Sequence, residues 1–263
     1  MQRMWLSDYQ FATFSVRGLD VPAVMLGTSP FIGAGQFGRK GETYYNHFFL
    51  QPENITEVVI QAIDLGVNAV QVIGYPQVVD AVQEAAKRTS TELFLLGTVG
   101  LGSIEREIQI MLDAGGQGVI IHGSLADRDM AFAREYLSPL QEQGLVTGIA
   151  THRPGMTIPR VEEMEEVDLI LCPLNKTGTF MDPSVESTLQ AIESSSKRIV
   201  AIKPLAAGRL SPQEGLEYVS DRAAGVAVGI ASRDEAEATF GIAKQHFGLE
   251  ATDALSAKVK HPE

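Results

Sequence analysis

Side chains that could do acid-base or covalent chemistry stand at the ends of short apolar segments in this sequence. Three of them are basic: His122 in Ile-Ile-His-Gly, His152 in Thr-His-Arg and Lys203 in Ala-Ile-Lys-Pro. Histidine exchanges protons near neutral pH, and a desolvated lysine can act as a base or attack a carbonyl carbon to form an imine. Tyr75 follows another apolar segment and adds a phenol as a candidate proton donor. These four residues are the catalytic candidates.

Other polar and aromatic residues lie near the same segment ends and are candidates for binding a substrate. They are Thr28, Ser29, Phe31, Tyr44, Tyr45, Gln71, Thr98 and Asn175. No Asp or Glu closes any of the segments, which disfavours a divalent metal site and glycoside hydrolysis because both depend on carboxylates. We therefore expect no metal. A zinc site made of His122, His152 and Cys172 is a weaker alternative, since their spacing is not a local zinc motif and Cys172 is more typical of a small core residue.

Eight apolar segments recur about every 25 to 30 residues, and each is followed by a segment with helical spacing. They cover residues 22–27, 67–73, 92–98, 118–122, 145–151, 167–173, 198–203 and 225–230. Continuous apolar runs are typical of strands buried on both faces of a parallel sheet. Eight such units predict a closed (β/α)8 barrel, a TIM barrel, in which the catalytic candidates share the carboxyl rim. An open doubly wound sheet is the alternative, but no G-x-G-x-x-G motif opens the first crossover.

Helical periodicity and start signals predict the elements between the strands. The expected helices cover residues 54–63, 78–87, 103–113, 129–142, 185–193, 212–219 and 234–246, and the weakest pattern lies at residues 158–165. Asn54 is expected to cap the first of them, with Glu57 three residues later. Ser211 followed by Pro212 and Glu214 is a second start signal.

The sequence predicts one domain over residues 1–263, with a barrel core at about 22–247. Residues 10–20 alternate enough for a short hairpin at the bottom of the barrel, and residues 248–263 are expected to form a tail or a last helix. Residues 31–54 form a long aromatic and glycine-rich loop, for which a lid over the site and a contact in a homo-oligomer are both open interpretations. Gly33-x-Gly35-x-x-Gly38 in this loop is a poor dinucleotide motif because it does not open a helix.

Composition narrows the class of ligand. The chain has 263 residues, 44% of them hydrophobic, and a formal net charge of −12. This apolar fraction is enough for a full core, and the acidic balance disfavours a nucleic-acid surface. No membrane span or signal peptide is recognised, and a single cysteine allows no disulfide within the chain, so we expect a cytoplasmic protein that binds a small molecule.

Five motifs occur in an order that resembles the aldo/keto reductase superfamily over about residues 22 to 245. They are Leu26-Gly-Thr-Ser-Pro-Phe31, Ala62-Ile-Asp-Leu-Gly-Val-Asn68, Ile121-His-Gly123, Gln143-Gly-Leu-Val-Thr-Gly-Ile149 and Lys203-Pro-Leu-Ala-Ala-Gly-Arg-Leu210. The resemblance implies a (β/α)8 barrel that reduces carbonyl groups with NADPH. It also implies an Asp, Tyr, Lys and His tetrad, in which the tyrosine protonates the carbonyl oxygen.

The tetrad is degraded when it is carried over residue by residue. Gln71 stands at the aspartate position and Thr98 at the lysine position, Tyr75 lies about one residue before the tyrosine position, and His122 matches the histidine. For the cofactor, the resemblance and the basic residues nearby imply contacts from Thr151, Lys203, Arg209, Ser232 and Arg233.

Three functions stay open on the sequence alone. The first is an NAD(P)H-dependent carbonyl oxidoreductase acting on a small polar substrate, with Tyr75 or His122 as the acid. The second is a cofactor-free lyase, aldolase or isomerase in which Lys203 acts with His122 and His152. The third is a ligand-binding barrel without catalysis, because the fold alone does not decide function.

Overall fold

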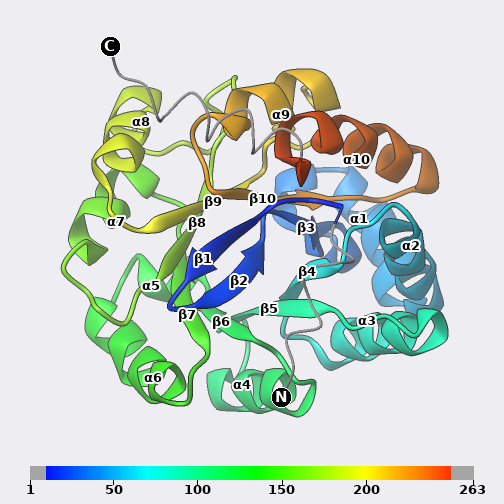
Figure 1. Cartoon of the computed structure of the whole chain (residues 1–263), viewed down its shortest axis with the longest axis horizontal. Helices are drawn as coiled ribbons and strands as arrows, with labels where there is room; N and C mark the ends of the chain where they lie inside the picture. The colour runs from blue at the N-terminus through cyan, green and yellow to red at the C-terminus, as the bar shows by residue number, and fades with distance from the viewer. Residues whose placement is uncertain (1–9, 250–263) are drawn as a thin grey trace.

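A closed barrel of eight parallel strands forms the centre of the protein (Figure 1). The structure is a computed structural model that describes residues 10–249. The barrel strands, in sequence order, are β3 (Val24–Gly27), β4 (Ala69–Ile73), β5 (Phe94–Val99), β6 (Gly118–Ile121), β7 (Val146–Ala150), β8 (Leu169–Pro173), β9 (Arg198–Ile202) and β10 (Gly225–Gly229). Strand β10 pairs with β3 and closes the ring. The predicted (β/α)8 barrel is confirmed, and the open-sheet alternative is wrong.

Alternation along the strands divides the core into two layers. One set of side chains packs inside the barrel and includes Met25, Ala69, Leu96, Ile120 and Leu169. The residues between them, such as Val70 and Ile121, pack outward against the helices. Successive side chains of a strand point to opposite faces, so both faces of these strands must be apolar. This explains why the segments read as continuous apolar runs.

Helices surround the barrel in Figure 1. They are α2 (Pro52–Asp64), α3 (Pro76–Thr89), α4 (Ile104–Asp113), α5 (Gly123–Ala126), α6 (Met130–Glu142), α7 (Pro154–Val161), α8 (Val185–Ser194), α9 (Pro212–Ser220) and α10 (Arg233–Phe247). Ser211 and Glu214 form the complete capping box expected at the start of α9.

Helices α2, α3 and α7 begin earlier than the sequence predicted, each at a proline: Pro52, Pro76 and Pro154. Helix α2 begins at Pro52, so Asn54 is inside the helix and its side-chain amide donates instead to the His47 carbonyl at 2.8 Å. A proline at the first helical position costs no hydrogen bond, which favours the earlier start. Helix α7 begins at Pro154 rather than at Ile158 and ends at Val161, for the same reason.

The hairpin of β1 (Thr13–Val16) and β2 (Leu19–Pro22) covers the amino-terminal end of the barrel, as predicted. Val16 and Val21 pack in the barrel interior with Met25, Phe94 and Val146, which lie near the starts of their strands. In Figure 1 the hairpin crosses the amino-terminal opening of the barrel, in front of the strands. The hairpin therefore closes this end and leaves the carboxyl end for a ligand.

The long segment after β3 contains short helical turns. They are η1 (Ser29–Ile32), η2 (Gly35–Phe37), α1 (Lys40–Tyr44) and η3 (Tyr45–Phe49). Phe31 and Phe48 are buried and their ring centroids lie 5.0 Å apart, which anchors the segment to the core. The expected tail or last helix at 248–263 lies outside the described residues, apart from Gly248 and Leu249. None of the helices in residues 10–249 combines the length and hydrophobicity that crossing a bilayer requires.

Candidate functional site at the carboxyl rim of the barrel

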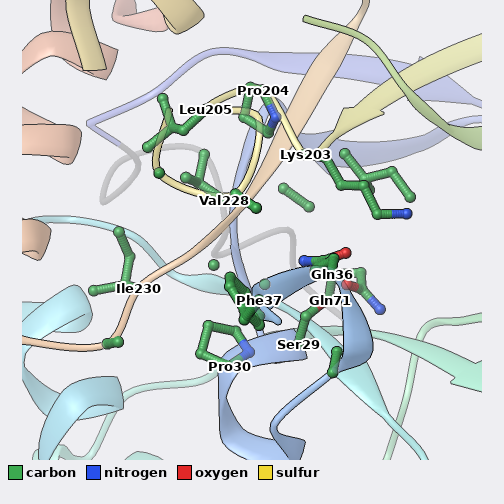
Figure 2. Close-up of a pocket in the computed structure, with 18 of the residues that line it drawn as sticks. Ser29, Pro30, Gln36, Phe37, Gln71, Lys203, Pro204, Leu205, Val228 and Ile230 are labelled. Atoms are coloured by element: carbon green, nitrogen blue, oxygen red, sulfur yellow. The ribbon is translucent and has the colours of Figure 1, made fainter. Parts of the chain in front are cut away.

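A cavity of about 860 Å³ opens at the carboxyl ends of the strands. Its lining includes seven of the residues selected from the sequence: Ser29, Tyr44, Gln71, Thr98, His122, His152 and Lys203. Figure 2 shows one side of the cavity formed by Ser29, Pro30, Gln36 and Phe37 and the opposite side formed by Lys203, Pro204 and Leu205. Three of the four catalytic candidates therefore share one cavity.

Gln71 on β4 and Thr98 on β5 form a neutral pair inside the barrel mouth. The Gln71 side-chain amide donates to the Thr98 hydroxyl at 2.8 Å, and both residues are buried. The strands are in register here, with Gln71 opposite Leu96 and Ile73 opposite Thr98. Neither side chain carries charge, so this pair can bind a polar group but cannot tune a proton donor as a carboxylate and an amine would.

His122 and His152 face each other across the ends of β6 and β7. Their ring centroids lie 5.0 Å apart in an edge-to-face arrangement. The Ser124 backbone N–H donates to His122 Nδ1 at 3.2 Å. Because that nitrogen accepts, the neutral ring carries its proton on Nε2, for which residues 10–249 provide no partner. His122 can therefore donate a hydrogen bond to a ligand.

Partial desolvation keeps both histidines neutral, although the His152 side chain is 47% exposed. Desolvation, with smaller contributions from His152 and Lys203, lowers the pKa of His122 to about 4. Desolvation and Lys203 also lower the pKa of His152. His152 Nδ1 lies 3.8 Å from an Asp127 carboxylate oxygen. Since the lowered pKa leaves the ring uncharged near neutral pH, this contact is between a dipole and a charge rather than an ion pair.

Asp127, at the end of α5, holds the turn that presents His152. Its carboxylate accepts hydrogen bonds from the Thr151 hydroxyl at 2.5 Å, the Thr157 hydroxyl at 2.7 Å and the His152 backbone N–H at 2.8 Å. The Asp127 side chain is only 8% exposed. Sequence reasoning missed this residue, because it lies in a loop 24 residues before the first of its partners and follows no strand directly.

Lys203 lies at the end of β9 in the left-handed backbone region, with φ of 56°. Its amino group lies 5.2 Å from the centre of the Phe180 ring, a cation–π contact that the sequence did not indicate. Desolvation lowers the pKa of Lys203 to about 8. At neutral pH the amine is thus mostly protonated, and a modest fraction is a free nucleophile.

At the start of α10, the two residues that the sequence suggested for phosphate binding make other contacts. Ser232 caps the helix by accepting from the Glu235 backbone N–H, and Arg233 forms an ion pair with Glu237 at 2.8 Å while its side chain is 72% exposed. The Glu235 carboxylate accepts from the Ala231 N–H at 2.9 Å. An acidic side chain therefore occupies the helix end, and Ser232 and Arg233 are not part of the cavity lining.

The other selected residues lie outside the main cavity. Thr28, Phe31, Thr151 and Asn175 are fully buried, and the Thr28, Thr151 and Asn175 side chains bond within the fold. Tyr75 packs edge-on against Phe49, and Tyr45 stacks on the same ring. Arg209 lines a separate groove nearby. The structure therefore brings His122, His152 and Lys203 together without Tyr75.

The proposed zinc ligands do not form a site. Within residues 10–249, no group of three His, Cys, Asp or Glu side chains is close enough to hold a metal ion. Cys172 packs in the layer between strands and helices, and burial raises the pKa of its thiol to about 12. As an outward-facing residue of β8, it lies in the core rather than at the barrel mouth.

Solved structures with a similar fold include several aldo/keto reductases. The chain aligns with one from Brucella melitensis at a TM-score of 0.62 and 13% identity, covering 94% of this chain and 99% of that one. An aldo-keto reductase enzyme from a Medee basin deep-sea metagenome aligns at 0.62 and 10% identity, covering 93% and 94%. A third, from Klebsiella pneumoniae in complex with NADP and acetate, aligns at 0.58 and 15% identity, covering 97% of each chain. No protein-family model and no curated protein sequence matches the chain. The aldo/keto-reductase-like barrel expected from the sequence motifs is thus confirmed as the fold.

Proposed function

We propose that this chain is an oxidoreductase that binds a nicotinamide dinucleotide and acts on the carbonyl group of a small polar molecule. The observation that carries the proposal is the extent of the cavity. It begins beside His122 and Lys203 and continues across the ends of β9 and β10 to Asp234, Glu235 and Thr239 on α10. A small substrate alone needs only the part beside the histidines, whereas an extended dinucleotide would fill the rest.

The lining fits the parts of such a cofactor. Pro204, Leu205, Val228 and Ile230 give apolar walls for flat rings (Figure 2). At the α10 end, the Asp234 and Glu235 carboxylates can accept hydrogen bonds from ribose hydroxyls. The NADP bound to the Klebsiella pneumoniae protein supports this use of the fold. The cofactor would supply the hydride, and the acidic α10 end favours NADH over the NADPH implied by the resemblance.

The chain's own groups would bind and polarise the carbonyl. His122 would donate its Nε2–H to the carbonyl oxygen, which is consistent with the Nδ1 acceptor role fixed by Ser124. Lys203, protonated near neutral pH, would stabilise the negative charge that develops on that oxygen and donate the proton that completes the alcohol. Gln71 and Thr98 would hold a second polar group of the substrate. In this proposal Tyr75 has no part in the reaction.

Loss of His122 tests the mechanism directly. His122→Ala should lower kcat/KM by about 100-fold or more if its hydrogen bond stabilises the transition state. His246→Ala, in the last turn of α10 and away from the cavity lining, is the matched control and should retain activity. Equal activity of the two variants would contradict the assigned role.

Cofactor binding tests the proposal as a whole. NADH and NADPH should each be titrated into the protein while cofactor fluorescence and the thermal unfolding midpoint are recorded. We expect a saturable signal with NADH and a weaker one with NADPH. No signal with either cofactor at millimolar concentration would refute the oxidoreductase proposal.

The partly buried Lys203 also supports a second candidate, a cofactor-free enzyme that forms an imine. A pKa of about 8 leaves part of Lys203 as the free amine, and the two neutral histidines beside it could exchange protons with an adduct. Borohydride reduction in the presence of small aldehydes and ketones should then add mass at Lys203. Absence of an adduct in peptide mass spectra, with trapping shown to work on a known imine enzyme, would exclude it.

A further inference from the structure

The loop between β8 and α8 brings an aromatic ring to the corner of the cavity that holds Lys203. At the start of this loop, the Leu174 N–H donates to the carbonyl of Ile202, the residue before Lys203, at 3.1 Å. Further along the loop, the Phe180 ring lies 5.2 Å from the Lys203 amino group and lines the cavity. A ring over an ammonium group attracts the charge and keeps water from that side of it. The loop therefore contributes to the environment of Lys203.

The backbone of Phe180 has a conformation that is unfavourable for a bulky residue. Its φ is 67°, in the left-handed region, and Lys203 beneath the ring also has a positive φ of 56°. Phe180 is 39% exposed, while the next residue, Met181, is buried in the core. Residues other than glycine persist in this region only where the surrounding structure holds them, and they are common at functional sites. The contacts that hold the loop therefore decide where the Phe180 ring lies.

The side chain of Asn175 makes the contacts that shape the loop. It is fully buried, and its amide nitrogen donates to the Thr179 carbonyl at 2.8 Å. Its amide oxygen accepts from the Thr177 hydroxyl at 2.8 Å and from the Thr179 N–H at 3.1 Å. The Thr179 carbonyl belongs to the peptide unit that precedes Phe180. Asn175 therefore fixes the backbone immediately before the ring.

The charged residues of the loop interact with other parts of the protein. Asp182 forms an ion pair with Arg153 at 3.2 Å, and Lys176 interacts with the exposed Glu214. The charge of Lys203 interacts instead with titratable side chains at the ends of neighbouring strands, which are His122, His152 and Cys172. The loop therefore acts on Lys203 through the Phe180 ring rather than through a charge.

We infer that Asn175 is a positioning residue, whose side chain holds the loop after β8 so that the Phe180 ring covers the Lys203 ammonium. The inference rests on the proposed function only for the part that Lys203 plays in the reaction. Without the Asn175 side chain, the backbone at Thr179 loses its hydrogen bonds and Phe180 can leave the left-handed region. The effect on Lys203 should then equal that of removing the ring itself.

Competitive labelling of Lys203 with acetic anhydride over a series of pH values, followed by peptide mass spectrometry, measures the access to this amine and its pKa without turnover. Asn175→Ala and Phe180→Ala should each raise the labelling rate at high pH several-fold and move the midpoint upward by a similar amount. In the Phe180→Ala background, Asn175→Ala should have no further effect on either quantity, because the two residues act on Lys203 through the same ring.

Asp168→Ala is the matched control, because Asp168 precedes the same strand at the opposite end of the barrel. Its carboxylate accepts from the Thr147 N–H at 3.0 Å and from the Thr147 hydroxyl at 3.2 Å, so the variant also loses hydrogen bonds of the fold. Its labelling at Lys203 should match that of the wild type. A wild-type profile in Asn175→Ala, an equal change in Asp168→Ala, or an added effect in the Phe180→Ala background would overturn the inference.

Gly178→Ala disturbs the same loop while Asn175 stays in place, and it decides the question if Asn175→Ala does not fold. Gly178 has φ of 72°, and an added Cβ would meet the Val185 side chain. This variant should change the labelling of Lys203 in the same direction as Phe180→Ala, and a wild-type profile would overturn the inference.

Turnover separates this inference from the proposed function. Where NADH-dependent reduction of a carbonyl is observed, Asn175→Ala should move the pH profile of kcat/KM in the same direction as Phe180→Ala. A profile that stays at the wild-type position would overturn the inference as well. If neither cofactor binds, the proposed function fails, while the labelling of Lys203 still decides the role of Asn175.

Discussion

Replacing Lys203 with methionine should make the protein more stable at neutral pH although it removes a group from the site. The Lys203 ammonium is held in a partly desolvated cavity, which lowers its pKa from 10.5 to about 8. Methionine has a similar length and no charge, so it fills the same space without the desolvation penalty. The higher free energy of unfolding of Lys203→Met should be seen only at pH values where Lys203 is charged in the wild-type protein.

The size and sign of the effect follow from proton linkage. Between the folded pKa of about 8 and the unfolded value of 10.5, the unfolded chain binds more protons, so wild-type stability rises with pH through this window. A shift of that size corresponds to a penalty of about 3.4 kcal/mol near pH 7, which falls to about 1.4 kcal/mol near pH 9.5. The advantage of Lys203→Met should therefore shrink by about 2 kcal/mol between these two pH values.

Urea unfolding of both proteins at the two pH values, followed by circular dichroism, measures this difference. Lys87→Met, at an exposed position on α3, is the matched control and should show a much smaller pH-dependent change. An advantage of Lys203→Met that stays constant across the window would refute the reasoning, because it would mean that the lysine charge is not desolvated in the folded protein. Loss of carbonyl reduction in the same variant is expected separately, from the role proposed for the ammonium.

Three further changes test other parts of the structure. Asp127→Ala removes the acceptor for the Thr151 hydroxyl, the Thr157 hydroxyl and the His152 N–H, and should lower the free energy of unfolding in urea by about 2–5 kcal/mol. Asp127→Asn should lower it less, because it keeps an acceptor oxygen. Equal losses in the two variants would contradict these hydrogen bonds. Val21→Ala, at a fully buried position of the hairpin, should lower the free energy of unfolding by about 1–3 kcal/mol because it leaves a cavity. An unchanged free energy of unfolding would show that the hairpin does not pack against the barrel there. Phe180→Ala removes a cation–π contact, which lowers the pKa of Lys203, and admits water, which raises it. Because desolvation is the main cause of the lowered pKa, we expect a net rise, so that the alkaline loss of activity expected near pH 8 moves to higher pH. An unchanged pH profile would remove Phe180 from the site.

This chain shares its fold with aldo/keto reductases, but its site lacks part of the catalytic tetrad that the resemblance implies. The shared fold and the different site have separate physical causes. The barrel follows from buried strands and amphipathic helices, and sequences with little identity can supply both. The catalytic groups depend on single side chains, and here Gln71 and Thr98 form a neutral pair in place of the Asp and Lys implied by the resemblance. The reaction proposed above therefore depends on His122 and Lys203 rather than on a phenol.

The sequence by itself determined the eight strands, most of the helices, the hairpin at the bottom and the rim that carries His122, His152 and Lys203. The strands and helices follow from the local periodicity of apolar residues, which short stretches of sequence contain. The shared rim then follows because the carboxyl ends of all strands of a parallel barrel lie at the same end. The tertiary structure decided which strand-end residues reach the cavity. Lys203 enters it through a left-handed backbone, while Tyr75 turns onto Phe49. It also brought Asp127 to the turn after β7, and Phe180 to Lys203. These contacts join segments far apart in the chain, and no local pattern specifies them because their energy arises only when the closed barrel brings its loops together.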